Sequence, residues 1–124
     1  MRAVKDFSPE VDSAGLARGF VAATLAAWDL NDLNEVACLL TGELASNAIR
    51  HAHTTFRLAV ELSPPELLVE VVDLAPSLPV PGQPRGDLRS GRGLVMVEAL
   101  ADRWGVRFLD DAKAVWFRLL VGGG

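Results

Sequence analysis

The stretch Thr41-Gly42-Glu43-Leu44-Ala45-Ser46-Asn47-Ala48-Ile49-Arg50-His51-Ala52 indicates the second half of a helix that begins near Asn31. At 3.6 residues per turn, Glu43, Asn47 and either Arg50 or His51 stand one above another. The other positions of this helix are apolar in nearly every direction, which is typical of a buried helix. Because a buried polar group without a partner costs on the order of a few kcal/mol, we expect a hydrogen-bond network or a metal–phosphate ligand here.

The same polar side chains also fit a second interpretation, in which they form the solvated face of an ordinary amphipathic helix. Solvated faces are usually rich in Lys and Glu at positions that can pair. This face has a single Glu, small residues and an Asn, which is a poor helix former. The composition therefore favours a site, and both interpretations stay open at this point.

Length and composition indicate one globular domain, residues 1–124. Half of the residues are hydrophobic and 23% are charged, which suits a folded domain with a real core. The net charge of −4 argues mildly against nucleic-acid binding. The apolar runs are too short to cross a membrane, and no secretory signal is visible, so we expect a cytoplasmic protein. Cys38 is the single cysteine, which rules out an internal disulfide.

The first third of the chain predicts a short strand or loose arm at residues 1–7 and then a helix. Ser8-Pro9-Glu10 is a helix-start signal, and the helix should run to about Trp28. The Asp29-Leu30-Asn31-Asp32 segment should separate it from the second helix. The expected buried stripe of the first helix comprises Leu16, Phe20, Ala23 and Ala27, widened by Ala17, Val21, Thr24 and Trp28.

The remaining elements complete an α+β two-layer sandwich. Alternation predicts a strand at 56–62 and a more apolar, more central strand at 67–73, joined as an antiparallel hairpin. A short helix at 93–101 and strands at 104–109 and 114–121 follow. We expect a mostly antiparallel sheet with about three helices on one face. The glycines of residues 122–124 suggest a flexible tail.

Residues 74–92 are a long segment without periodicity, rich in Pro and Gly. Such a segment inside a small domain is usually functional. It carries Arg85, Arg89 and Arg92, and Gly91-Arg92-Gly93 leads directly into a helix N-terminus, which suits a phosphate group. These glycines could instead serve only the loop end and the helix start.

Three polar residues outside this loop suit nucleotide chemistry. Asp73 ends the central strand and can accept a hydrogen bond from an exocyclic amine, although Asp also caps turns there. The Asn47 oxygen suits Mg²⁺, and Glu43 could take a proton from water or from a hydroxyl that attacks a γ-phosphate. His51 and His53 resemble a metal pair, but histidines at a helix end more often complement the helix dipole, so we expect no zinc.

The Glu43-Leu-x-x-Asn47-Ala-x-x-His51-Ala pattern resembles the N box of the Bergerat-type (histidine kinase-like, GHKL) ATPases. The chain most resembles the anti-sigma-factor serine/threonine kinase branch, which includes stand-alone actinobacterial ATP-binding regulators. No P-loop motif occurs. The resemblance spans nearly the whole chain through these segments: Val72-Asp73-x-Ala-Pro76, Gly91-Arg-Gly93-Leu94, Leu100-Ala-Asp-Arg-Trp104-Gly105 and Lys113-Ala-Val-Trp116-Phe117.

The resemblance implies ATP and Mg²⁺ as cofactors and assigns a role to each site residue. Glu43 would be the catalytic base, Asn47 the Mg²⁺ ligand, and Asp73 the acceptor of the adenine amine. Residues 74–92 would form the ATP lid. The other implied nucleotide-binding residues are Arg50 and His51 beside the site, Ala75 after the adenine-binding Asp, and Gly91, Arg92, Gly93 and Leu94 near the phosphates.

The implied function is an ATP-binding regulator that phosphorylates a small anti-sigma-factor antagonist and binds a sigma factor, with homodimerisation as an option. The alternative is a non-catalytic, partner-sequestering module of the same fold. It is motivated by Asp73-Leu-Ala75-Pro76-Ser77, which replaces the glycine-rich Asp-x-Gly-x-Gly of the kinases and loses an N–H donor at Pro76. A free-standing ATP hydrolase is a third, weaker alternative.

Overall fold

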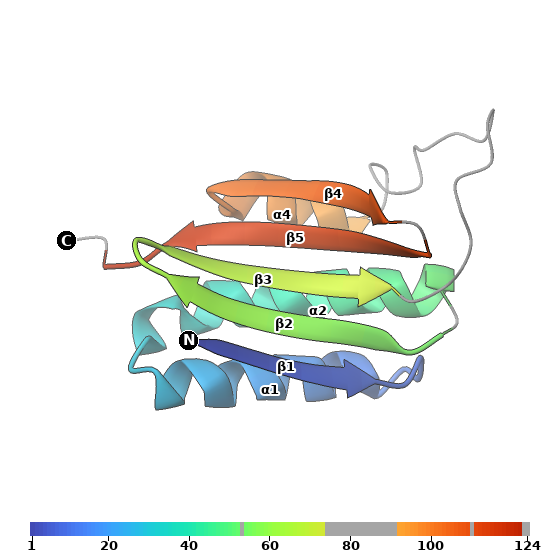
Figure 1. The fold of residues 1–124 in the computed structure, drawn as a ribbon, viewed down its shortest axis with the longest axis horizontal. Coiled ribbons are helices and arrows are strands. Elements are labelled where there is room, and N and C mark those ends of the chain that lie inside the picture. Colours follow the sequence, from blue (N-terminus) through green and yellow to red (C-terminus); the bar gives the residue numbers. More distant parts are fainter. Residues whose placement is uncertain (53, 74–91, 110, 123–124) are drawn as a thin grey trace.

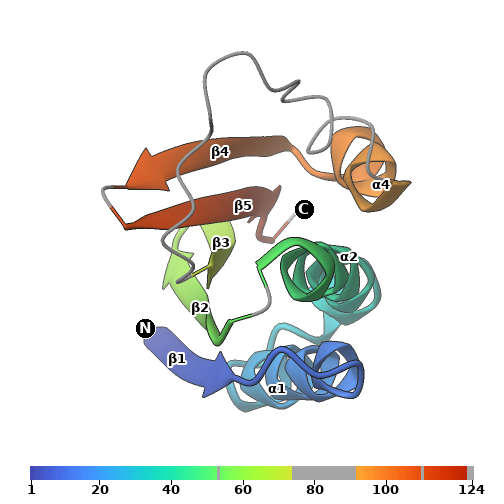
Figure 2. The same ribbon diagram turned by 90° about the vertical axis from the view of Figure 1, so that its right-hand side faces the viewer.

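The computed structural model describes residues 1–52, 54–73, 92–109 and 111–122. One layer is a five-stranded antiparallel sheet, and the helices cover one of its faces (Figures 1 and 2). The elements in chain order are β1 (Arg2–Phe7), α1 (Ser13–Ala27), the 3₁₀ turn η1 (Asn31–Leu33), α2 (Asn34–Ala52), β2 (Phe56–Ser63), β3 (Glu66–Asp73), α4 (Arg92–Leu100), β4 (Arg103–Leu109) and β5 (Ala112–Leu120). The predicted α+β two-layer sandwich is confirmed.

The sheet has the strand order β1-β2-β3-β5-β4, and every neighbouring pair is antiparallel. The predicted hairpin is present as β2 and β3, and the more apolar β3 is central, as its sequence indicates. The first residues form edge strand β1 rather than a loose arm. No helix in the described ranges is long and apolar enough to cross a membrane.

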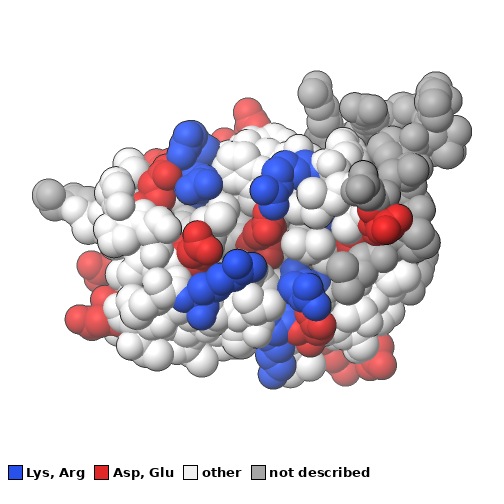
Figure 3. Space-filling view, in the orientation of Figure 1, with Lys and Arg blue, Asp and Glu red and all other residues white. Residues whose placement is uncertain are grey.

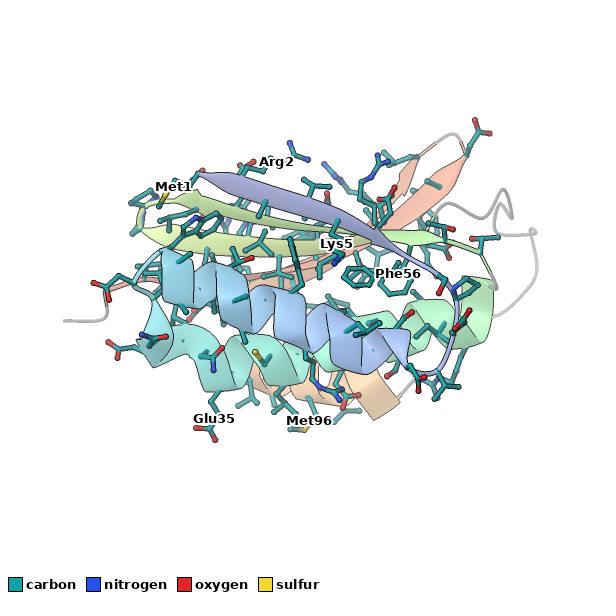
Figure 4. The ribbon with its side chains drawn as sticks, turned by 90° about the horizontal axis from the view of Figure 1, so that it is seen from below. Met1, Arg2, Lys5, Glu35, Phe56 and Met96 are labelled. Carbon is teal, nitrogen blue, oxygen red and sulfur yellow. The ribbon has the colours of Figure 1, made fainter. Side chains whose placement is uncertain are left out.

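The core lies between the helix layer and the sheet. Phe56 points from β2 toward α1 (Figure 4) and stacks on Phe7 at a ring-centroid distance of 5.5 Å. The fully buried side chains come from both layers, which ties the helices to the sheet through apolar burial. The largest are Phe56, Phe117, Leu25, Leu40, Leu44, Leu58 and Leu67.

One prediction for α1 is wrong and a second is wrong in part. The helix begins at Ser13 and not at Ser8, because β1 continues to the buried Phe7 and the chain then has to pass from the sheet to the helix layer. Of the expected buried side, Ala17, Val21 and Thr24 are buried as predicted, and Phe20 and Trp28 are partly buried against the core. Leu16, Ala23 and Ala27 are exposed instead.

The predicted break between the first two helices is present, but the second helix begins later than predicted. Asp29 adopts a left-handed conformation with φ of 58°, which ends α1. The segment expected to begin the second helix first forms η1, so α2 itself begins at Asn34. Cys38 on α2 is half-buried, and burial raises the pKa of its thiol.

The other face of the sheet carries paired charges (Figure 3). Arg57 donates to Asp6 at 2.8 Å, which lowers the pKa of that carboxyl. Glu66 accepts hydrogen bonds from both Arg103 and Arg118, and Arg107 pairs with Glu70. These cross-strand pairs keep the uncovered face of the sheet polar, and each contributes modestly to stability.

Gly105 in β4 lets the indole ring of Trp116 lie across the sheet. The two residues are paired directly between β4 and β5. A Cβ atom at position 105 would lie 2.7 Å from Cζ2 of Trp116 and 3.0 Å from its Cε2. A side chain here must therefore displace a rigid ring.

We expect Gly105→Ala to lower the free energy of unfolding by about 1–3 kcal/mol, because the added methyl group collides with the indole. The matched control is Gly19→Ala in α1, where a Cβ would meet nothing within 4 Å. That control should stabilise the protein by about 0.5–1 kcal/mol through helix propensity. Urea unfolding measures both, and shifts of the same sign would contradict the packing account.

Candidate functional site

The candidate site is built on the C-terminal half of α2. Glu43 and Asn47 lie four residues apart and thus on one side of the helix. Glu43 is half-buried and Arg50 is exposed, whereas Asn47 is only 2% exposed. The polar sector of the helix therefore passes from the interior at Asn47 to solvent at Arg50, and the solvated-face interpretation is wrong for Asn47.

Asn47 holds a buried oxygen atom that lacks a partner. Its Oδ1 is buried and makes no hydrogen bond within the part of the chain that the structure describes. Such an atom costs about 1–3 kcal/mol of desolvation free energy unless a ligand satisfies it. An amide oxygen is also a hard ligand of the kind that Mg²⁺ prefers. Asn47 therefore fits a bound cation.

Asp73 is the second buried polar residue of the site. It is the last residue of β3, is 5% exposed, and lies on the helix-facing side of the sheet with Val69 and Val71. Its Oδ2 lies 4.0 Å from Nζ of Lys113, which is the residue paired with it on β5. A buried carboxylate at a strand end can accept a hydrogen bond from a ligand amine.

Lys113 lies beside Asp73 in the candidate site, and the sequence interpretation did not assign it there. It lies far from Asp73 in the sequence, and only the register of β3 and β5 brings the two together. Burial lowers the pKa of the Lys113 ammonium, and the charge of Asp73 opposes that shift. The pKa of Lys113 is lowered overall, because the attraction to Asp73 at 4.0 Å does not fully compensate for desolvation of the ammonium.

These residues lie at one end of the fold. Figure 1 shows that β3 ends beside the last turns of α2, and Figure 2 looks directly onto this end. Helix α4 begins at Arg92, close to where it was predicted, and packs against α2. Its N-terminus lies at the same end (Figure 1), where free N–H groups favour an anion.

Several predicted site residues are described only in part. The structure describes His51, Arg92, Gly93 and Leu94 as helical backbone without their side chains. Ala75, Gly91 and most of the predicted 74–92 lid lie outside the described residues. Arg50 is exposed. The described part of the candidate site therefore consists of Glu43, Asn47, Asp73 and Lys113.

Comparison with known proteins identifies the family. The model of the histidine kinase-like ATPase domain matches residues 7–119, so the chain belongs to this family. Membership implies that the protein binds ATP, which agrees with the polar residues gathered at the end of α2 and β3. No curated protein is similar enough in sequence to count as a match.

Two solved structures show the same fold. The RsbU and RsbW domains of Rv1364c from Mycobacterium tuberculosis match with a TM-score of 0.74 and 15% identity, over 98% of this chain and 32% of that one. The Acinetobacter baumannii histidine kinase AdeS matches with a TM-score of 0.57 and 15% identity, over 98% of this chain and 68% of the kinase. The chain thus spans about a third of the length of the mycobacterial relative.

We expect Asn47→Leu to leave the free energy of unfolding of the nucleotide-free protein unchanged within about 1 kcal/mol or to raise it, because it removes an unsatisfied oxygen at similar volume. Thr41→Val should behave alike, since Oγ1 of Thr41 is also buried without a partner among the described residues. Leu44→Ala, one turn before Asn47, should instead cost about 2–5 kcal/mol. A comparable loss in Asn47→Leu, measured by urea unfolding, would show that Asn47 is satisfied within the protein.

Proposed function

We propose that this chain is an ATP-binding regulatory protein that transfers the γ-phosphate of ATP to a Ser or Thr of a small antagonist protein. We further propose that it sequesters an RNA polymerase sigma factor, with which that antagonist competes. The observation that carries the proposal is the buried Oδ1 of Asn47, which has no hydrogen-bond partner among the described residues and lies one helical turn after the half-buried Glu43. A protein without a ligand for this oxygen would gain stability by replacing it.

The described residues divide the work of the proposed reaction. Asp73 accepts a hydrogen bond from the exocyclic amine of adenine and so fixes the base. Asn47 would hold Mg²⁺, which when bound neutralises charge on the phosphate oxygens. Glu43 takes the proton from the attacking Ser or Thr hydroxyl. The oxygen of that hydroxyl forms the new bond to the γ-phosphorus, and ADP leaves. The N-terminus of α4, which includes Arg92, Gly93 and Leu94, would bind the phosphates.

A non-catalytic module of the same fold is the second candidate. It is favoured by the Asp73-Leu-Ala75-Pro76 sequence, in which Pro76 cannot donate a backbone hydrogen bond to a phosphate. Such a module would bind a partner without phosphorylating it. This module would bind nucleotide weakly or not at all, and Glu43 would not act as a base in it.

We expect the wild-type protein to bind ATP, and Asp73→Asn to lower the affinity by about tenfold or more, because the variant loses the charged acceptor of the base amine. Isothermal titration calorimetry measures both constants. The matched control is Asp32→Asn, which changes an exposed aspartate of η1. Equal affinities in the Asp73 variant and the control would remove Asp73 from the site.

We expect Glu43→Gln to keep ATP affinity and to slow phosphotransfer by about 10²–10⁴-fold, the usual contribution of a general base. The readout is the single-turnover transfer of ³²P from ATP to the antagonist protein. Glu35→Gln is the control, because Glu35 lies on the same helix and points away from the sheet (Figure 4). Full transfer by Glu43→Gln would exclude the base role, and no transfer by the wild type would favour the non-catalytic module.

A further inference from the structure

Helix α4 is held to the rest of the fold by little apolar burial. Of its described side chains only Val97 is fully buried and Met96 is half-buried, whereas Val95 and Leu100 are 59% and 42% exposed. Helix α2, in contrast, buries apolar side chains at several positions between residues 37 and 48. Because one fully buried side chain contributes only about 1.5–3 kcal/mol, apolar packing alone defines the direction of α4 weakly.

Hydrogen bonds join the C-terminal end of α4 to the sheet. Nε1 of Trp104 on β4 donates to Oε2 of Glu98 in the last turn of the helix. Asp102, just after the helix, is bound to β5 by two further hydrogen bonds. Its N–H donates to the carbonyl oxygen of Arg118 at 3.0 Å, and its Oδ2 accepts from the N–H of Leu120 at 2.7 Å. The direction of the whole helix is therefore set from its C-terminal end.

Trp104 is a firm attachment point for Glu98. It is paired with the buried Phe117 across β4 and β5, lies on the same side of the sheet, and packs against the core. Glu98 lies near the C-terminus of α4, where the helix dipole disfavours negative charge. The charge of Glu98 therefore does not favour the helix itself, and its described contact is the one with the sheet.

The other end of α4 lies where the nucleotide is proposed to bind. Arg92 begins the helix six residues before Glu98, which is about 9 Å at 1.5 Å per residue. A tilt of about 10° at Glu98 would thus move the helix start by about 1.5 Å, enough to take an N–H group out of hydrogen-bonding distance of a phosphate oxygen. Asn47, with its buried Oδ1 that lacks a partner among the described residues, lies at the same end on α2, against which α4 packs (Figure 1).

We propose that Trp104 and Glu98 are positioning residues that direct the N-terminus of α4 toward the phosphate groups of a nucleotide bound beside Asn47. This inference rests on the proposed function, since it requires a nucleotide in that site. Neither side chain contacts the nucleotide. Their hydrogen bond involves a carboxylate and is therefore about twice as strong as a neutral one. It holds the free N–H groups of the helix start in one direction, so that phosphate binding needs no rearrangement.

A direct effect of the Glu98 charge on the nucleotide would have the opposite sign. Removal of a carboxylate near a triphosphate removes repulsion, so charge alone predicts tighter ATP binding in both Glu98→Ala and Glu98→Gln. Loss of the hydrogen bond predicts weaker ATP binding in Glu98→Ala. Glu98→Gln keeps an oxygen that accepts from the indole, so it should restore most of the affinity. The two variants together thus separate positioning from charge.

The test measures the affinities for ATP and for adenosine by isothermal titration calorimetry. Adenosine carries the base without phosphate groups, so its affinity does not depend on the N-terminus of α4. The proteins are the wild type, Glu98→Ala, Glu98→Gln, and Trp104→Phe, which keeps an aromatic ring and removes the donor. The matched controls are Glu35→Ala, which removes an exposed carboxylate of α2, and Trp28→Phe, which changes a partly buried indole at the C-terminal end of α1.

We expect Glu98→Ala and Trp104→Phe each to lower the affinity for ATP about tenfold and to leave the affinity for adenosine unchanged within about twofold. The double variant should lose no more than either single variant, because both substitutions remove the same hydrogen bond. Glu98→Gln and the two controls should bind ATP within about threefold of the wild type.

Several results would overturn the inference. A structural role alone would lower the affinities for ATP and adenosine by the same factor. Tighter ATP binding by both Glu98 variants would show an effect of charge, and additive losses in the double variant would show that Trp104 and Glu98 act separately. A wild type that bound ATP no more tightly than adenosine would leave α4 without a role at the phosphates.

Failure of the proposed function is a distinct result. If the wild type bound neither ATP nor adenosine at millimolar concentration, the proposed function would fail and the inference with it. ATP binding by the wild type, with an unchanged ratio of the two affinities in Glu98→Ala and Trp104→Phe, would remove only the positioning role of these two residues.

Discussion

The structure depends on the burial of helix α2 against the sheet while the helix carries polar side chains. Leu40, Leu44 and Ala48 fix the helix by apolar burial, and this same packing takes Asn47 out of water. The free energy that apolar burial contributes is large enough to hold in place one amide oxygen that has no partner among the described residues. A ligand group positioned in this way needs no rearrangement when the ligand arrives.

The sheet supplies the other half of the site by the same logic. Central strand β3 is buried along its helix-facing side. Its last residue, Asp73, lies on this side and is therefore buried too. Antiparallel pairing with β5 then places Lys113 directly opposite Asp73. The two opposite charges are thus held 4.0 Å apart in a largely buried position. The candidate site combines these groups with the buried Asn47 of α2.

The parts of the fold that could be predicted are those with a local signal. Alternation in Phe56, Leu58 and Val60 and the turn at Pro64-Pro65 predicted the β2–β3 hairpin. The spacing of Glu43 and Asn47 predicted that both lie on one side of α2, which defines the candidate site. On α1 the prediction of buried Ala17, Val21 and Thr24 was right, but Leu16 was wrongly placed in the core because small and apolar residues occur on all sides of this helix. Lys113 was missed because cross-strand register is a non-local property that no sequence window contains.

The central claim is that Oδ1 of Asn47 is a cation ligand of the nucleotide complex. The most direct measurement is the affinity for ATP, by calorimetry, at increasing Mg²⁺ concentration in the wild type and in Asn47→Leu. The account predicts that Mg²⁺ tightens ATP binding by the wild type, that this gain is lost in Asn47→Leu, and that the two proteins bind metal-free ATP alike. An equal gain from Mg²⁺ in both proteins would contradict it.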